Sequence, residues 1–286
     1  MAAHWQAADT VPLGSWLLRA DGGFTGRANS ALPLGDPGLP LAQAVDEVEA
    51  WYRARGLPAM IVIPGPLGAA APDGGQAGDP LDILLAGRGW RVRSAPAVVM
   101  TAGTGQVAGA GLAGTGEAGT GTASAVTFTA RPDEAWLARY RYRGTGVPTA
   151  ALRLLLSAPW QAFASVVADG ETVAVGRVSV AADWAGISAV EVDPRFRRRG
   201  LGVAVTRALA AEAARQGAAR IFLQVEGDNL AARGLYARCG FVGVYRYHYR
   251  VAPVGKRQLE RSGSHRLTGH ETEAGRGRSR RRSSGL

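Results

Sequence analysis

An arginine- and glycine-rich stretch occupies residues 190–203, where Asp193 and Pro194 end an apolar segment and Gly200 and Gly202 directly precede a helical pattern. Glycines at such a turn let backbone N–H groups approach a ligand, and the N-terminus of a helix attracts anions. The stretch is not a Walker A loop, because no Lys-Ser/Thr pair follows the glycines, and it is not a G-x-G-x-x-G fingerprint. It predicts a pyrophosphate cradle with three adjacent positive charges, which are Arg197, Arg198 and Arg199.

A second group of chemically useful residues follows at a fixed distance. Asn229 and Tyr236 are two helical turns apart, so a helix would place both on the same side. The Asn229 amide can orient a ligand, and the Tyr236 phenol can donate a proton. Two carboxylates, Glu191 and Glu226, are candidate general bases, and a chain of water molecules is an equal alternative.

Alternating strand and helix patterns surround these residues and predict an α/β domain with a mixed sheet. Asp169 and Gly170 predict a tight hairpin turn, and Gly217 and Gly240 are typical of helix ends. The expected strands are residues 162–168, 172–180, 187–192, 221–225 and 241–251, and the expected helices are residues 133–141, 149–157, 201–216 and 229–238.

The first part of the chain repeats this order in a degenerate form. Residues 85–90 hold the place that residues 236–241 hold in the second half. Because residues 34–38 carry no arginine–glycine loop ahead of their helix, the first half is not expected to bind a cofactor. Its expected helices are residues 40–53 and 81–86, and its expected strands are residues 60–63 and 91–100.

Two segments of biased composition divide the chain. Residues 102–125 are rich in Gly, Ala and Thr and predict a flexible linker between domains 1–101 and 126–252. Residues 253–286 combine many arginines with few large apolar residues, which predicts a disordered tail. A solvated tail is favoured over an electrostatic clamp on nucleic acid, because no aromatic residues are interleaved with the arginines.

Composition excludes several other classes of protein. The chain of 286 residues has a net charge of +10, and its 47% hydrophobic and 20% charged residues exclude wholesale disorder. The single cysteine, Cys239, excludes an internal disulfide and a Cys-rich zinc site, and four scattered histidines form no ligand cluster, so no metal is expected. The absence of a long apolar run or a signal-peptide pattern predicts a cytoplasmic protein without membrane contact.

Residues 126–250 resemble the GNAT superfamily of acyl-CoA N-acyltransferases. The run Arg197-Arg-Arg-Gly-Leu-Gly202 matches the Arg/Gln-x-x-Gly-x-Gly/Ala loop of that family, and Tyr236 occupies the position of its general acid. The resemblance implies a GNAT fold and direct transfer of an acetyl group from acetyl-CoA to an amine, with the backbone of Val192 pairing with the pantetheine arm. The implied acetyl-CoA contacts are Val192, Arg197, Arg198, Arg199, Gly200, Leu201, Gly202, Val203 and Asn229.

Residues 14–38 gather polar side chains in a segment punctuated by glycines. Arg19, Arg27 and Asn29 are suited to grip a carboxylate, and the equal alternative is a hairpin whose polar groups satisfy one another. This segment and the paired halves are similar to an actinobacterial group of tandem GNAT proteins that includes N-acetylglutamate synthases. That similarity implies L-glutamate as the acceptor and a role in arginine biosynthesis.

Three alternatives to glutamate acetylation stay open. They are acetylation of another small amine, acetylation of a protein N-terminus, and a non-catalytic CoA-binding regulatory module. The presence of Tyr236 argues against the module. The expected partner is a small-molecule amine, and the sequence is compatible with a homodimer.

Overall fold

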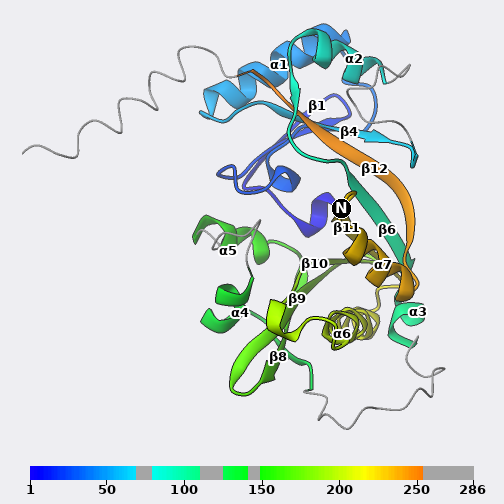
Figure 1. Ribbon diagram of the computed structural model, residues 1–286. Coiled ribbons are helices and arrows are strands. Elements are labelled where there is room, and N and C mark those ends of the chain that lie inside the picture. Colours follow the sequence, from blue (N-terminus) through cyan, green and yellow to red (C-terminus); the bar gives the residue numbers. More distant parts are fainter. Residues whose placement is uncertain (69–78, 110–124, 141–148, 254–286) are drawn as a thin grey trace, which may run out of the picture. The chain divides into compact units, whose positions relative to one another are not determined.

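The computed structural model describes residues 1–68, 79–109, 125–140 and 149–253 (Figure 1). Most of the predicted linker, residues 110–124, lies outside the described residues, as does the predicted tail from residue 254 onward. The elements of the second half are β7 (Thr127–Thr129), α4 (Glu134–Arg139), α5 (Thr149–Leu155), β8 (Trp160–Ala168), β9 (Glu171–Ala181), β10 (Trp184–Val192), α6 (Leu201–Arg215), β11 (Arg220–Glu226), α7 (Leu230–Arg238) and β12 (Val242–Val251).

An antiparallel meander followed by a parallel crossover forms the framework of this half. β8 and β9 join at Asp169 and Gly170, whose φ angles of 52° and 77° confirm the predicted tight turn. β9 pairs with β10 in antiparallel fashion, and β10 pairs with β11 in parallel after the chain has crossed through α6. The helices and strands predicted for this half are therefore confirmed, with bounds that differ by a few residues.

Two hydrophobic clusters cover the opposite faces of the sheet. Ala164 of β8 belongs to the cluster that contains Val205 and Leu209 of α6. The preceding residue, Phe163, points the other way and belongs to the cluster formed with α4 and α5. α6 lies very close to the sheet, because a Cβ atom on Gly176 of β9 would come within 2.7 Å of Val205 Cγ1.

The first half repeats the order of three strands, a helix, a strand, a second helix and a strand. Its first three strands form an antiparallel sheet, and a parallel bridge between Ala31 and Ile61 joins the third of them to the fourth. Trp16, Tyr52 and Leu85 lie in a core of their own. The elements are β1 (Asp9–Leu13), β2 (Trp16–Ala20), β3 (Leu32–Pro33), α1 (Leu41–Ala54), β4 (Met60–Gly65), α2 (Pro80–Gly87), β5 (Arg91–Val92) and β6 (Ala97–Gly103).

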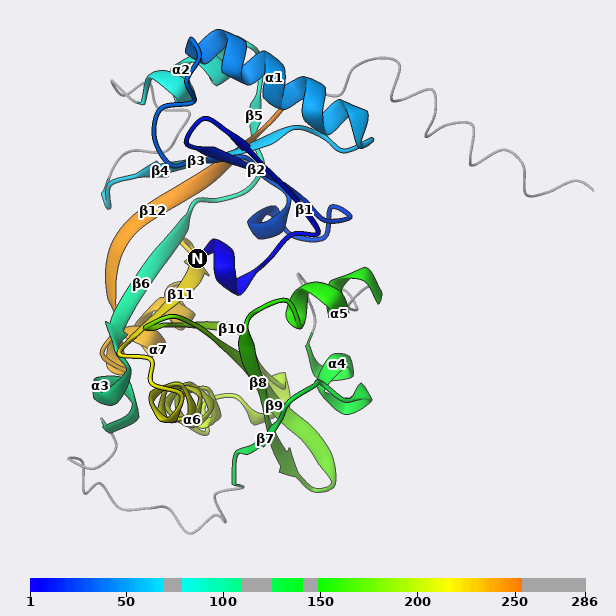
Figure 2. The same cartoon turned by 180° about the vertical axis from the view of Figure 1, so that it is seen from behind.

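Strands of both halves meet in one sheet. β6 lies between β11 and β12 and is antiparallel to both, and the C-terminal part of β12 pairs with β4 and β5 (Figure 2). The resulting order is β4-β12-β6-β11-β10-β9-β8-β7. The predicted fold class, a mixed-sheet α/β protein of the GNAT type, is confirmed, whereas the division into domains 1–101 and 126–252 stays a prediction.

Two segments differ from the predictions. The single strand expected over residues 91–100 is two strands, β5 and β6, because the chain bends at Ser94 and Ala95. The next residue, Pro96, has no N–H for a strand ladder, and its carbonyl accepts a hydrogen bond from Gly227. The start of the expected linker is ordered, because β6 continues to Gly103 and the short helix α3 (Thr104–Gly109) follows. Val107 of α3 is fully buried and anchors this turn beside α6.

Membrane-spanning helices and metal-binding clusters are both absent from the part of the chain that the structure describes. None of its helices is long and apolar enough to cross a lipid bilayer. Its His, Cys, Asp and Glu residues form no group of three or more that could hold a metal ion.

Candidate active site

A gap between β10 and β11 forms the centre of the candidate site. The two strands pair only from Trp184 to Ile187 on β10, and a bulge then interrupts β10 between Ser188 and Glu191. Ala189 within the bulge has a φ of 55°, a left-handed conformation that is uncommon for residues other than glycine. Beyond Ile187 the facing edges of the strands are no longer paired with each other, and a pocket of ≈ 830 Å³ opens between them.

The loop at the end of β10 leads directly into helix α6. Arg198 and Gly200 have φ angles of 64° and 79°, so the chain makes a tight turn before the helix begins at Leu201. Within the part of the chain that the structure describes, no side chain caps this N-terminus, and the first-turn N–H groups have no acceptor within the helix. Gly202 keeps the start of α6 close to α7, because a Cβ atom there would come within 2.7 Å of Leu235 Cδ1. Unfilled backbone donors and the helix dipole fit the phosphates of a CoA molecule.

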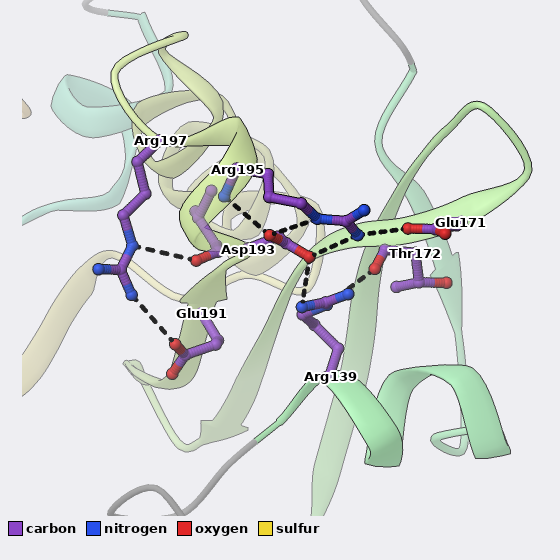
Figure 3. Close-up of polar contacts among 8 residues, drawn as sticks. Arg139, Glu171, Thr172, Glu191, Asp193, Arg195 and Arg197 are labelled. Atoms are coloured by element: carbon purple, nitrogen blue, oxygen red, sulfur yellow. Dashed lines mark hydrogen bonds and ion pairs between the residues drawn. The ribbon is translucent and has the colours of Figure 1, made fainter.

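The predicted loop residues divide into two groups. Arg197 lines the pocket, and its Nε donates to the Val192 carbonyl at 3.3 Å while its Nη2 lies 3.7 Å from Glu191 Oε1 (Figure 3). A pantetheine arm that uses the Val192 carbonyl would therefore have to displace Arg197. The other predicted contacts lie on the loop and first turn of α6 rather than among the pocket-lining residues; these are Arg198, Arg199, Gly200, Leu201, Gly202 and Val203.

A buried carboxylate that the sequence analysis did not single out holds this loop in place. Asp193 is 4% exposed and accepts hydrogen bonds from the backbone N and the guanidinium of Arg195 (Figure 3). Its Oδ2 lies 2.8 Å from Arg139 Nη1, and Arg139 Nε donates to the Thr172 carbonyl at 2.8 Å. Hydrogen bonds from Arg195 lower the pKa of Asp193 to about 2, with a further contribution from the charge of Arg139. Asp193 thus ties the loop before α6 to helix α4, and Arg139 itself lines the pocket.

Tyr236 and Asn229 both line the pocket from α7, as the spacing predicted. Asn229 is the N-cap of α7, and its side-chain oxygen accepts from Ala232 N at 3.0 Å, so the amide is partly committed to the helix. Burial raises the pKa of Tyr236 to about 12, with smaller contributions from Cys239 and Glu191. The phenol is therefore protonated at neutral pH and can donate a proton. Cys239 is fully buried in the α6-side core.

The two candidate bases lie on opposite walls of the pocket. Glu191 is on β10 within reach of Arg197, and Glu226 is exposed at the end of β11. Both carboxylates line the pocket, and the assignment of a base stays a prediction.

The three predicted acceptor residues have different surroundings. Asn29 accepts from the N atoms of Asp21 and Gly23 and donates to backbone carbonyls, and Arg19 donates to the carbonyl and hydroxyl of Ser30. Neither lines the large pocket, and their contacts match the alternative in which the hairpin satisfies its own polar groups. Arg27 does line the pocket, and its guanidinium lies 4.2 Å from the centre of the Trp5 ring.

The pocket is lined by Arg27 and by further residues that the sequence analysis missed. Tyr247 and Tyr249 of β12 line it, together with Arg93 beyond β5. The alternation of Tyr245, Tyr247 and Tyr249 was a usable signal, because residues two apart in a strand share a face. Their place beside β10 and β11 could not be read from it, since β6 separates β12 from β11.

A family model described as the C-terminal region of the probable histone acetyltransferase Rv0428c matches residues 1–250. The uncharacterized N-acetyltransferase YobR of Bacillus subtilis is 30% identical over 259 residues, which cover 87% of this chain and 95% of YobR. The probable histone acetyltransferase Rv0428c of Mycobacterium tuberculosis is 29% identical over 237 residues, which cover 78% of this chain but only 63% of that protein. A solved GCN5-related N-acetyltransferase from Kribbella flavida has the same fold, with a TM-score of 0.60, 18% identity and coverage of 88% of this chain and 92% of its own. The chain therefore belongs to the family of the Rv0428c C-terminal region, and with it to the GNAT superfamily of N-acetyltransferases.

Proposed function

We propose that the protein transfers the acetyl group of acetyl-CoA to the primary amine of a small molecule. The observation that carries this proposal is that one pocket is lined by the separated edges of β10 and β11, by Arg197 next to the N-terminus of α6, and by Tyr236. An acyl-CoA has matching parts, namely phosphates for the helix N-terminus and amides for the open edge of β10. When bound, acetyl-CoA supplies an activated thioester.

The residues around the gap have separate tasks in the reaction. The first-turn N–H groups of α6 and the arginines before it hold the phosphates, and the open edge of β10 aligns the thioester arm. Glu191, Glu226 or a water molecule takes a proton from the amine before it attacks. Tyr236, whose raised pKa keeps it neutral, gives its proton to the departing thiolate.

The similarity to tandem GNAT proteins suggests L-glutamate as the acceptor. It also suggests a role in arginine biosynthesis. Arg27 supports an acidic acceptor, because it lines the pocket from the first half of the chain (residues 26–28) rather than from the loop before α6. A lysine on a basic protein tail is the acceptor that the name of the M. tuberculosis relative would suggest. Arg27 and Arg93, which line the pocket and form no ion pair with an acidic side chain of the described residues, disfavour such a positively charged segment.

The test measures CoA release from acetyl-CoA with full-length protein and a panel of amines that includes L-glutamate, other amino acids, polyamines and an N-terminal peptide. Tyr236→Phe is expected to lower kcat by about 10²-fold or more while acetyl-CoA still binds. Tyr52→Phe serves as the matched control, because Tyr52 is a buried phenol in the first-half core. Tight acetyl-CoA binding with no CoA release for any amine would instead favour a non-catalytic CoA-binding module.

A further inference from the structure

A second, smaller cavity adjoins the large pocket near Arg27, Tyr247 and Tyr249, a region that we call the acceptor end. It measures ≈ 80 Å³ and shares four lining residues with the large pocket, which are Arg27, Gln224, Tyr247 and Tyr249. A molecule whose amine lies near the β10–β11 gap can therefore meet the walls of the smaller cavity with its other end. The proposed reaction does not use this cavity.

The walls of the smaller cavity are mainly apolar and aromatic. The apolar and aromatic lining includes Trp5, Leu32, Val62, Phe222, Tyr245 and Tyr247. The polar lining consists of Arg19, Arg27 and Gln224, and the Arg19 guanidinium already donates to the carbonyl and hydroxyl of Ser30. The Tyr247 and Tyr249 rings meet edge to face with centroids 5.4 Å apart, so part of this wall is fixed. Tyr249 is also held against Gly26, where an added Cβ atom would come within 2.7 Å of its Cζ. A rigid apolar cavity of this kind favours an aliphatic or aromatic group over a charged one.

Arginine side chains that form no ion pair with a described carboxylate lie near the same region. Within the described residues, neither Arg27 nor Arg93 forms an ion pair with an acidic side chain. Arg177 is fully buried, and among the described residues its hydrogen bonds reach the carbonyls of Leu155 and His4 and the hydroxyl of Ser188.

Arg177 adds to the positive potential at the pocket. Burial lowers the pKa of its guanidinium to about 9, which still leaves the group charged at neutral pH. Its guanidinium and that of Arg27 both lie against the Trp5 ring, at 5.0 Å and 4.2 Å from the ring centre. Ser188, which Arg177 contacts, lines the large pocket. A carboxylate bound at Arg27 would reduce the cost of holding these cations together.

We propose that the acceptor is an α-amino acid, or a closely similar amino carboxylate, with an apolar or aromatic side chain. Its carboxylate binds Arg27 and Arg93, its side chain enters the ≈ 80 Å³ cavity, and its amine faces the β10–β11 gap. This inference rests on the proposed acetyl transfer and sharpens its acceptor. Glutamate has the required carboxylate but would place a second one in a cavity lined mainly by apolar and aromatic side chains, where the Arg19 guanidinium already donates to Ser30, so it is a poorer match than leucine or phenylalanine.

The first experiment compares acceptors in the CoA-release assay with full-length protein. L-Leucine and L-phenylalanine are expected to have a kcat/KM about 10- to 100-fold above those of their amides, which lack the carboxylate. They are also expected to exceed glycine and L-glutamate by about tenfold or more, because only they fill the apolar cavity. Amides or glycine that react as well as leucine would overturn the inference while leaving acetyl transfer intact.

Variants assign the preference to the named residues. Arg27→Gln is expected to remove most of the advantage of leucine over leucine amide, mainly through KM. The matched control is Arg91→Gln, an exposed arginine on β5 outside both cavities. Val62→Asp is expected to reduce turnover of leucine more than that of glycine, because it places a charge in the apolar cavity. An unchanged acid-to-amide ratio in Arg27→Gln would contradict the proposed carboxylate site.

A binding measurement tests the inference without relying on catalysis. Titration calorimetry with N-acetyl-L-leucine, N-acetyl-L-leucine amide and N-acetyl-L-glutamate, each with CoA present, reports the affinity of the acceptor end directly. The expected order is N-acetyl-L-leucine first, with the other two at least tenfold weaker. Equal or reversed affinities would overturn the inference. If these ligands bind in the expected order but no amine releases CoA, the acceptor site stands and the proposed transfer fails.

Discussion

The two halves of the chain share one order of elements and even the same helix endings, yet only the second contains the β10–β11 gap. Trp90 N donates to Leu85 O at 3.0 Å, and Phe241 N donates to Tyr236 O at 3.0 Å, so α2 and α7 end in the same motif. In each case the intervening glycine has a positive φ. The scaffold is therefore common to both halves, and the chemistry depends on local differences within it.

Three local differences separate the halves. β3 has two residues and touches β4 through one bridge, whereas β10 has nine residues and a bulge that opens the pocket. α1 begins after Pro40 without preceding arginines, whereas α6 begins after Gly200 and an arginine run. Leu85 is fully buried in the first-half core at the place where Tyr236 lines the pocket. A strand bulge, a helix start and one phenol turn the same scaffold into a candidate catalytic site.

The largest expected effect comes from replacing Tyr236 by leucine, the residue at the equivalent position of the first half. Tyr236→Leu should lower kcat by about 10²- to 10⁴-fold, because the thiolate loses its proton donor, while the Kd of acetyl-CoA changes little. Stopped-flow CoA release and calorimetric binding measure the two quantities. The reverse change, Leu85→Tyr, should cost stability through a buried hydroxyl without changing kcat. Equal kcat in Tyr236→Leu and the parent protein would remove Tyr236 from the mechanism.

A substitution in the first turn of α6 should give the next largest effect. Gly202→Val should weaken acetyl-CoA binding on the order of 10- to 100-fold, because the new side chain would collide with Leu235 and move the N-terminus of α6. Gly87→Ala is the control in α2, where an added Cβ atom has no neighbour within 4 Å, and it should leave binding unchanged. Calorimetry with acetyl-CoA tests both, and retained affinity in Gly202→Val would show that this N-terminus does not hold the phosphates.

The buried Asp193 should give a smaller effect that also depends on pH. Asp193→Asn should lower kcat/KM for acetyl-CoA by about tenfold, because Arg139 and Arg195 lose the charge that holds the loop. Asp9→Asn removes an exposed pair with Arg55 in the first half and should change little.

The sign of the pH dependence follows from the lowered pKa of Asp193. Folding favours the ionised carboxylate, so its contribution to stability is present above the ordinary pKa of about 4 and is lost as the pH falls toward 2. The difference in unfolding free energy between the parent protein and Asp193→Asn should therefore shrink over that range. A difference that stays constant down to pH 2 would contradict the ion pairs as its source.

The elements of the second half were predictable because each is bounded by a local signal. Asp169 and Gly170 fix a hairpin, Gly217 and Gly240 end helices, and Gly200 precedes α6. The same local reading located Tyr236 and the loop before α6, since their spacing along the chain is part of the pattern.

What the sequence could not supply depends on contacts between distant segments. The insertion of β6 between β11 and β12, and thus the tyrosines at the acceptor end, follows from long-range strand pairing. Asn29 looked like a ligand residue because its amide is versatile, yet the fold uses that amide within its own hairpin. Asp193 is recognisable in the sequence directly before Pro194, but the sequence does not show that its ion-pair partner is Arg139 of the distant helix α4.

The smallest expected effect concerns the pH dependence of stability at two buried histidines. His248 contacts the first half of the chain, and His4 contacts the second half. His248 of β12 lies 3.0 Å from the Asp82 carboxylate of α2, whereas the His4 ring contacts the Ser179 hydroxyl of β9, at 3.0 Å from its Nδ1, and the ring of Phe222. Burial is the main cause that lowers the pKa of His4 to about 4, so folding favours its neutral form. Its contribution to stability is then complete above the ordinary pKa of about 6.5 and is lost as the pH falls toward 4. Between pH 7 and pH 5.5 this loss should amount to about 1 kcal/mol.

A His4→Gln variant isolates this contribution, because glutamine keeps a hydrogen-bonding group near Ser179 but does not titrate. Urea unfolding at pH 7 and pH 5.5 should show a smaller decrease in stability for the variant than for the parent protein. His248→Gln should not flatten the profile in the same way, since burial lowers the pKa of His248 while the hydrogen bond and charge of the Asp82 carboxylate oppose that change. Equal slopes for the parent protein and His4→Gln would mean that the contact with β9 does not depend on a neutral histidine.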